Sequence, residues 1–427
     1  MSNFARLIRQ RYPYRAPSAS VDHLVVGGGV VGLAVAAGLV NTAGAGRTTF
    51  LVERRQLPQV AALYSRSRPA VREGRGSGDS PQEDWQVATD KHQIPYLDGL
   101  QAHSNNSAFL NGQPESAMVN NSVIPAYFLS GHEARDMEPD LSPKVCAALL
   151  VTETGIVNSG SLVESLEREI QEEDYLKASG ADKNGVGLAG RSFDRGEGVI
   201  VPGTRVVRID PAEDGKGWVV QLESNWEDGP GDIDAVRASV VVDAAGLNSA
   251  ALVNELLPEE EQMNIYISKG SWRRECQQAH LPVSQRQLGF TWDASYGNIR
   301  FGPDVEALGS AEDSAADPDF WQKHLAPSAA HLESIGQAAQ AMLPGVDPSL
   351  LQPDYAGFRP NIAPPGAGFF DFVVRHSPQR RGLIEMFGFA SPGLTSSLAA
   401  GEYVAKMVRA QVWGGRDAER LAEGWEQ

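Results

Sequence analysis

Three glycines near the start of the chain, Gly27, Gly29 and Gly32, have the G-x-G-x-x-G spacing of a nucleotide-binding turn. An apolar run that ends at Val26 comes before them, and an alanine-rich run over residues 30–41 follows. This order predicts a buried parallel strand, a tight turn and a helix whose positive end faces the phosphates of a dinucleotide. A glycine-rich turn without a ligand is the alternative.

A second apolar strand, over residues 48–52, ends at Glu53. The acid follows Gly32 by about 20 residues, the distance typical of the carboxylate that binds a ribose hydroxyl. In that arrangement Gly27 allows the tight turn, Gly29 lets backbone N–H groups approach the pyrophosphate, and Gly32 lets the helix pack on the strand. The strand, glycines, helix and acid together favour a nucleotide site over an empty turn.

A later apolar strand, over residues 238–242, runs through Asp243 into the small residues Ala244, Ala245 and Gly246. Small residues let the backbone come close to a ligand. We therefore expect this segment to lie near the same pyrophosphate and ribose.

A last strand, over residues 383–389, leads into Ser391, Gly393, Leu394 and Thr395, which open a helix. The unpaired N–H groups at a helix start suit the negative charge on a reduced flavin, although an ordinary capped helix is the alternative. These features favour FAD over a nicotinamide cofactor. The expected cofactor-binding residues are Gly27, Gly29, Val30, Val31, Gly32, Glu53, Arg54, Ala244, Ala245, Gly246, Ser391, Gly393, Leu394 and Thr395.

Composition limits the classes of function. The chain has 427 residues, 42% of them hydrophobic, which suggests two or three domains. Its net charge of −17 argues against a nucleic-acid partner. Two cysteines are too few for a disulfide scaffold or a zinc cluster, so we expect no metal site. No apolar run is long enough for a transmembrane segment.

The N-terminus differs from this acidic background. Residues 1–21 contain Arg6, Arg9, Arg11 and Arg15 and no acid. An arginine-rich, acid-free segment is typical of a mitochondrial presequence, and otherwise of a basic tail before the first strand. Mitochondrial and cytoplasmic locations both stay open.

The expected strands of the nucleotide site are scattered along the chain. We predict a mixed α/β fold, in which a discontinuous Rossmann-like FAD/NAD(P)-binding domain carries an inserted antiparallel-sheet substrate domain. The FAD-binding domain is expected to comprise residues 22–55, 145–262 and 352–415. The substrate domain is expected to comprise residues 85–144 and 263–351, and residues 56–84 have the composition of an irregular, disordered loop.

Four segments carry a resemblance to a known family: Val26–Glu53, Phe128–Val157, Ile299–Glu306, and Pro353–Pro360 together with Phe387–Ser396. The sequence resembles the D-amino-acid-oxidase-like superfamily of FAD-dependent oxidoreductases and, within it, the L-2-hydroxyglutarate dehydrogenase family. The resemblance implies that (S)-2-hydroxyglutarate is oxidised to 2-oxoglutarate by hydride transfer to FAD. It leaves the electron acceptor, the oligomeric state and the mode of flavin attachment open.

A substrate with two carboxylates needs fixed cations, and guanidinium groups suit carboxylates. Arg359 and Arg300 are the candidates, with Lys269, which also fits the family pattern, as a third. The alternative for each is a surface position or an ordinary ion pair.

The sequence departs from the family after the second strand, where the family carries the histidine expected to act as the base. Residues 56–84 occupy that place and contain no histidine. Three explanations are open: a defective gene model, a non-catalytic relative that still binds FAD, or another group in place of the histidine. An oxidase of amino acids or N-methyl amino acids on the same fold is a further alternative.

Overall fold

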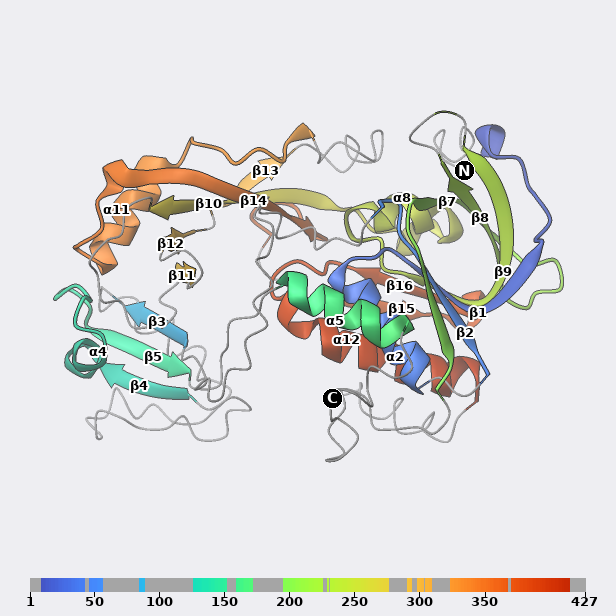
Figure 1. Cartoon of the computed structure of the whole chain (residues 1–427), viewed down its shortest axis with the longest axis horizontal. Coiled ribbons are helices and arrows are strands. Elements are labelled where there is room, and N and C mark those ends of the chain that lie inside the picture. The colour runs from blue at the N-terminus through green and yellow to red at the C-terminus, as the bar shows by residue number, and fades with distance from the viewer. Residues whose placement is uncertain are drawn as a thin grey trace.

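The computed structural model describes residues 9–42, 46–56, 84–88, 126–151, 159–171, 195–225, 229, 231–275, 290–293, 298–302, 304–308, 323–367 and 370–414. These residues form two lobes joined by two long strands (Figure 1). One lobe holds a largely parallel sheet with helices, and the other holds separate antiparallel sheets, so the predicted fold class is confirmed. Apart from its two ends, the loop predicted over 56–84 lies outside the described residues.

The larger sheet has eight strands, with the main order β15-β16-β9-β1-β2-β6. Its parallel strands are β1 (Ala19–Val26), β2 (Thr48–Val52), β6 (Glu197–Val201), β9 (Asp232–Asp243) and β16 (Leu383–Phe387). Three strands are antiparallel to their neighbours: β7 (Thr204–Pro211), β8 (Trp218–Ser224) and β15 (Val373–His376).

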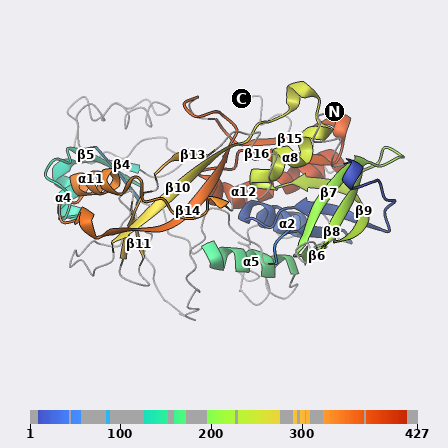
Figure 2. The same cartoon turned by 90° about the horizontal axis from the view of Figure 1, so that it is seen from above.

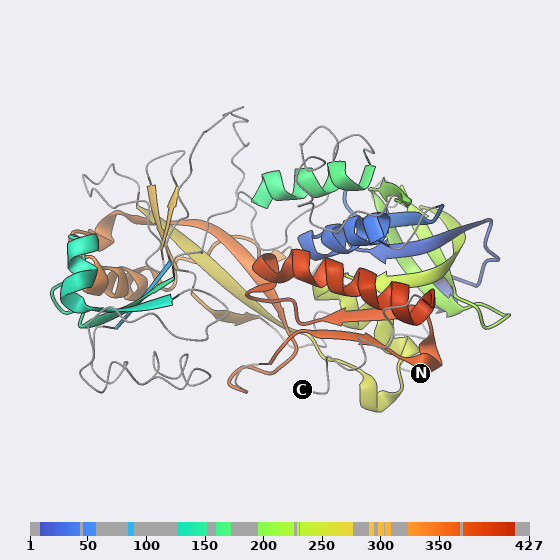
Figure 3. The ribbon, with the colours of Figure 1, turned by 90° about the horizontal axis from the view of Figure 1, so that it is seen from below.

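Three helices cover one face of this sheet: α2 (Val30–Thr42), α5 (Ser159–Gln171) and α12 (Gly393–Met407), as Figure 3 shows. The hairpin of β7 and β8 and the short helix α8 (Ser249–Val253) lie toward the other face. Apolar side chains therefore cover β1 on both faces, and Leu24 and Val25 are fully buried. This explains why β1 ends in the uninterrupted apolar run of Leu24, Val25 and Val26 rather than in an alternating pattern.

Helices α2 and α12 pack through small residues. A Cβ atom added to Gly401 would lie 2.4 Å from the backbone oxygen of Ala34, and one added to Gly38 would lie 2.8 Å from that of Gly401. Ala405 packs against Gly38 one turn further on. Because the contacts advance in the same direction along both helices, the helices are parallel and their N-termini lie at the same end.

The second lobe contains two antiparallel sheets. The five-stranded sheet comprises β10 (Tyr266–Glu275), β11 (Phe290–Asp293), β12 (Asn298–Phe301), β13 (Glu306–Leu308) and β14 (Leu351–Asn361). The three-stranded sheet comprises β3 (Asp84–Ala88), β4 (Ala126–Ser130) and β5 (Ala147–Val151). Helices α4 (Gly131–Met137) and α11 (Leu332–Met342) complete the lobe, and β10 and β14 run side by side toward the parallel sheet (Figure 2).

Strand pairing divides the chain differently from the predicted domains at two places. The prediction assigns residues 145–151 and 352–361 to the FAD-binding domain. In the structure β5 pairs with β3 and β4, and β14 pairs with β10, so both segments belong to the antiparallel sheets. Pairing partners are distant along the chain, and the local sequence that forms a strand does not specify them.

The N-terminal basic segment lies against the hairpin of β7 and β8 over residues 9–18. Arg9 pairs with Asp210 at 3.3 Å, and the Tyr12 hydroxyl donates a hydrogen bond of 2.9 Å to Glu223. The backbone N–H of Arg15 donates to the side-chain oxygen of Gln221 at 2.8 Å. Strand β1 then begins at Ala19. None of the helices among the described residues is long and apolar enough to cross a membrane.

His23, in the middle of β1, makes the stability of this lobe sensitive to acid. Its ring is fully buried; the Trp413 indole N–H donates to Nε2 at 3.0 Å, so Nδ1 carries the hydrogen and lies 2.9 Å from the Thr49 hydroxyl. Burial lowers the pKa of His23 from its ordinary value to about 4. The unfolded chain therefore binds a proton over a pH range in which the folded chain does not.

We expect the free energy of unfolding to fall by about 3 kcal/mol between pH 7 and pH 4 through this group alone, because acid favours the unfolded state there. Urea unfolding of the native chain and of His23→Gln, at both pH values, measures it. The variant should be less stable at pH 7 and lose less stability on acidification. Equal losses in the two proteins would contradict the assignment.

Candidate active site

The predicted nucleotide-binding segments meet at the carboxyl ends of three adjacent strands. Val26 of β1 is in register with Val52 of β2 and with Asp243 of β9. Just beyond the strands, the N–H of Gly27 donates to the backbone oxygen of Val52 at 2.9 Å, and that of Ala244 donates to the backbone oxygen of Val26 at 3.0 Å. Ligands of open α/β sheets bind at this edge.

The backbone at the glycine turn leaves no room for side chains at two positions. Gly27 has a φ of +107°, and a Cβ atom there would lie 2.5 Å from the backbone oxygen of Ala244. A Cβ atom on Gly32 would lie 1.9 Å from the backbone oxygen of Gly27. The first helical hydrogen bond runs from the N–H of Leu33 to the oxygen of Gly29, so the N–H groups before Leu33 start the helix without helical acceptors.

Glu53 lies against this turn. One carboxylate oxygen accepts the N–H of Gly28 at 2.7 Å, and the other accepts the N–H of Arg55 at 2.9 Å. The side chain is only 9% exposed. The carboxylate thus has a fixed position beside the turn, as a ribose-binding acid requires, and half-buried Arg54 follows it directly.

Asp243, the last residue of β9, is a buried acid that the list of expected site residues omits. Its Oδ1 accepts the N–H of Ala245 at 3.1 Å. Burial raises the pKa of Asp243 to about 7, and the negative charge of Glu385, in register on β16, contributes to the rise. The sequence signal for this residue is an acid that ends a buried strand immediately before Ala244.

The start of α12 contributes a second set of N–H groups. The first helical hydrogen bond in this helix runs from the N–H of Ser396 to the oxygen of Pro392, at 3.0 Å. The N–H groups of Leu394 and Thr395 therefore have no helical acceptor. Because α12 is parallel to α2, both helix starts lie at the same end, and the partial positive charge of each favours an anionic ligand.

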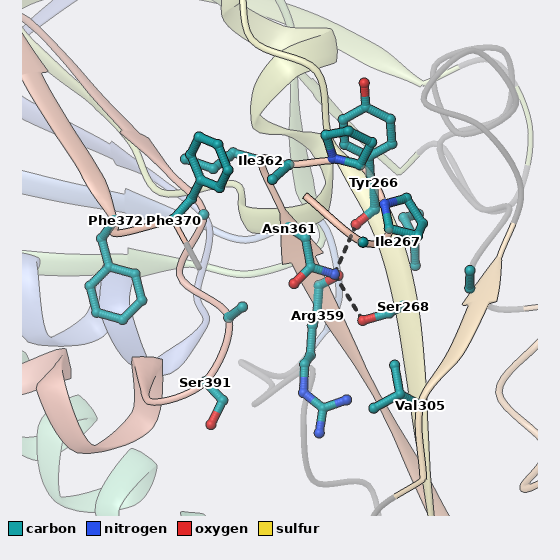
Figure 4. A pocket seen from close by; sticks show the side chains of 17 residues that line it. Tyr266, Ile267, Ser268, Val305, Arg359, Asn361, Ile362, Phe370, Phe372 and Ser391 are labelled. Atoms are coloured by element: carbon teal, nitrogen blue, oxygen red, sulfur yellow. Dashed lines mark hydrogen bonds between the residues drawn. The ribbon is translucent and has the colours of Figure 1, made fainter. Parts of the chain in front are cut away.

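A cavity of about 340 Å³ lies between the five-stranded sheet and the loop that leads into α12 (Figure 4). Strand β14 and the chain after it supply Arg359, Asn361 and Ile362, and the loop before α12 supplies Gly388, Ala390 and Ser391. The other lining residues are Tyr266, Ile267, Ser268, Val305, Ala307, Ala363, Pro364, Pro365, Gly366, Phe370 and Phe372. The cavity is therefore lined both by Arg359, which is predicted to bind substrate, and by Ser391, which is predicted to bind the cofactor.

Arg359 is the only charged side chain among the described residues that line this cavity. Its Nη1 atom is buried and has no hydrogen-bond partner among those residues. Burial lowers the pKa of Arg359 from its ordinary value, and the charge of Asp304 partly opposes this change. A cation that is partly withdrawn from water is stabilised by an anion, so the geometry favours a carboxylate ligand.

Lys269 does not share the cavity with Arg359. In the pairing of β10 with β14, Ser268 faces Arg359 and Lys269 faces Phe358. Successive strand residues point to opposite faces of a sheet, so Lys269 and Arg359 lie on opposite faces. The Lys269 ammonium donates to the backbone oxygen of Ala326 at 3.1 Å and lies 3.4 Å from Glu306.

Arg300 is separated from Arg359 along the sheet. It is in register with Arg274, six residues beyond the Ser268 partner of Arg359. That offset corresponds to roughly 20 Å at about 3.3 Å per residue. Arg300 also pairs with Asp354 at 2.6 Å. Of the three predicted cations, Arg359 alone lines the cavity.

Asn361 and Ser268 are cavity residues that the sequence reasoning missed. Asn361 could have been found from the period of two along β14, which places residue 361 on the same face as Arg359. Ser268 is identified by the strand register, in which it is the partner of Arg359. The register depends on tertiary structure, so the sequence alone gives only the first of these signals.

Three comparisons place the chain among known proteins. The family model described as FAD dependent oxidoreductase (DAO) matches residues 22–407. The mitochondrial L-2-hydroxyglutarate dehydrogenase of Arabidopsis thaliana is 26% identical over 339 residues, which cover 75% of this chain and 64% of that protein. The chain thus spans less than two thirds of the length of this relative.

Solved structures share the fold. An FAD-bound L-α-glycerophosphate oxidase from Mycoplasma pneumoniae superposes with a TM-score of 0.59 at 17% identity, covering 91% of this chain and 94% of its own. Glycine oxidase from Geobacillus kaustophilus gives a TM-score of 0.59 at 20% identity, with coverages of 92% and 96%. The glycine turn, Glu53 and the two helix starts fit an FAD molecule bound across the strand ends.

We expect Gly32→Ala to be purified with little or no flavin, because the added methyl group would collide with the backbone of Gly27. Visible absorbance per protein chain, with fluorescence of the released flavin, measures the loss. Gly215→Asn is the matched control, since Gly215 has a φ of +69°, a value that asparagine tolerates, and no atom within 4 Å of an added Cβ. A fully flavinylated Gly32→Ala protein would contradict the cofactor site.

Proposed function

Because this chain belongs to the DAO family of FAD-dependent oxidoreductases, we propose that it oxidises a 2-hydroxy carboxylic acid to the 2-oxo acid, with (S)-2-hydroxyglutarate as the first candidate substrate. The observation that carries the proposal is the half-buried guanidinium of Arg359, whose buried Nη1 has no hydrogen-bond partner among the described residues, in a cavity shared with Ser391. The Arabidopsis relative, named for 2-hydroxyglutarate, supports the choice of substrate.

The described residues that line the cavity favour a hydroxy acid over an amino acid as the substrate. Apart from Arg359, their polar groups in the cavity are neutral, and they include no aspartate or glutamate to pair with an ammonium group. A neutral hydroxyl needs only a hydrogen-bond partner. We therefore place the carboxylate of the substrate on Arg359 and its C2 hydroxyl among the neutral polar groups.

The protein residues divide the work of this reaction. Bound FAD supplies the hydride acceptor. Arg359 neutralises and orients the carboxylate, and Ile362 and Phe372 add apolar surface to the cavity. The hydroxyl proton must pass to a base. Since the described lining residues include no histidine or carboxylate, we assign that role to another part of the chain or to water.

The second carboxylate of 2-hydroxyglutarate needs a separate partner. Lys269 lies on the opposite face of the sheet, and Arg300 is ion-paired at a distance. We therefore infer that neither cation holds the substrate together with Arg359. A mitochondrial location stays a prediction, supported by the location named for the Arabidopsis relative.

The proposed activity is tested by mixing the flavin-loaded protein anaerobically with (S)-2-hydroxyglutarate and following the visible flavin absorbance. We expect bleaching with 2-hydroxy acids and none with the matching amino acids. Bleaching by amino acids or N-methyl amino acids alone would favour the oxidase alternative. A yellow protein that no acid bleaches would indicate a catalytically impaired FAD-binding protein.

We expect Arg359→Met to lower kcat/KM by roughly 30- to 1,000-fold, because about 2–4 kcal/mol of charge-assisted binding is lost. Arg359→Lys should retain part of the activity, since it keeps the charge without the planar donor pair. Arg300→Met and Lys269→Met are the controls and should change kcat/KM far less. Equal losses at positions 300 and 359 would contradict the assignment of Arg359.

A further inference from the structure

We propose that Asn361 determines specificity for substrates with a hydroxyl on C2, by accepting a hydrogen bond from that hydroxyl through its side-chain oxygen. The inference rests on the proposed function, in which Arg359 holds the carboxylate of the same substrate. It assigns a role to a residue that neither the sequence patterns nor the comparisons identify.

The orientation of the Asn361 amide is fixed by its neighbours. Its nitrogen donates to the backbone oxygen of Tyr266 at 3.2 Å and to the Ser268 hydroxyl at 2.8 Å. A backbone carbonyl can only accept a hydrogen bond, so the amide nitrogen must face Tyr266. Both amide hydrogens thus have acceptors on β10, and the amide cannot flip without losing them.

This arrangement leaves the side-chain oxygen available. In Figure 4 the Asn361 oxygen lies on the side away from the two dashed bonds to Tyr266 and Ser268. In the part of the chain that the structure describes, no donor is hydrogen-bonded to this oxygen. The available atom in the cavity is therefore an acceptor of fixed direction.

Asn361 and Arg359 line the same cavity. They lie two residues apart on β14, so both side chains leave the same face of the sheet, and both line the cavity. The Asn361 nitrogen also lies 3.4 Å from the backbone oxygen of Arg359. A carboxylate on Arg359 carries its C2 substituent in the same cavity, where a fixed acceptor can select for a donor.

An acceptor at this position discriminates by chemistry rather than by size. A C2 hydroxyl replaces the water that the amide oxygen loses when substrate binds. A C2 hydrogen cannot replace it, so an acid without the hydroxyl leaves a desolvated acceptor unpaired. An amide oxygen is too weak a base to take the proton itself, so this contact belongs to the bound ground state. The hydroxyl has a single hydrogen, which must turn from Asn361 to a separate base before the hydride leaves C2.

The test uses two ligands of nearly equal size on the flavin-loaded protein. Rapid anaerobic mixing with (S)-2-hydroxyglutarate gives a Kd and a limiting rate of flavin reduction. Glutarate, which lacks the hydroxyl, gives an inhibition constant. For Asn361→Leu we expect the Kd of hydroxyglutarate to rise by roughly 5- to 100-fold, with glutarate affinity unchanged within about twofold. The limiting rate should change less than the Kd.

Two further variants make the result decisive. Ser268→Ala removes one of the two acceptors that fix the amide. It should raise the Kd of hydroxyglutarate as Asn361→Leu does, but by a smaller factor. If Asn361→Leu does not fold, Ser268→Ala tests the role of the Asn361 amide. Gln352→Leu makes the same amide-to-leucine exchange at an exposed position of β14 outside the cavity lining and should leave both constants unchanged.

The outcomes separate this inference from the proposed function. If Asn361→Leu weakens both ligands equally, Asn361 has only a structural role and the inference fails. If Asn361→Leu selectively weakens the binding of glutamate instead of hydroxyglutarate, Asn361 accepts a hydrogen bond from a C2 amine, and the inference fails in its stated form. If the native chain binds hydroxyglutarate more tightly than glutarate but is never bleached, the proposed activity fails. In that case the perturbation of flavin absorbance by each ligand still measures the role of Asn361.

Discussion

The turn after β1 passes so close to its neighbours that the rest of the nucleotide-binding lobe has to accommodate it. The backbone of Gly27 lies against Ala244 on one side and against α2 at Gly32 on the other, with no space for a side chain in either gap. This contact fixes the ends of β1, β2 and β9 at one edge of the sheet. It also sets the direction of α2, against which α12 packs in parallel through Gly38 and Gly401.

The parallel packing of α2 and α12 has a functional consequence. It brings two helix starts, which lie more than 300 residues apart in the chain, to the same end of the lobe. Their N–H groups, the Glu53 carboxylate and the backbone after Asp243 then face one region. Small residues at the helix contact and at the turns serve the same purpose, because each allows backbone to reach a place that a larger side chain would occupy.

The substrate side depends on a different constraint, the alternation of side chains along β10 and β14. These long strands bring Arg359 to the loop before α12, so that one cavity contains both a proposed carboxylate-binding group and a predicted flavin-binding segment. The same alternation turns Lys269 to the opposite face, where Glu306 and a backbone oxygen satisfy it. The pairing of β10 with β14 therefore decides which cations can act on the substrate.

The sequence by itself determined the local features of this protein. The run of Val25 and Val26 into Gly27, Gly29 and Gly32, and the acid at Glu53, were sufficient to predict the strand–turn–helix unit and a dinucleotide ligand, since spacing and residue size control such turns directly. The preference for FAD also used the apolar strand before Ala244 and the helix start at Ser391 to Thr395. The tertiary structure decided the rest. Which of Arg359, Arg300 and Lys269 meets the cofactor segment depends on strand register, and the use of Asn361 depends on an amide held by another strand. Both are set by pairing between distant segments, for which the local sequence carries no separate signal.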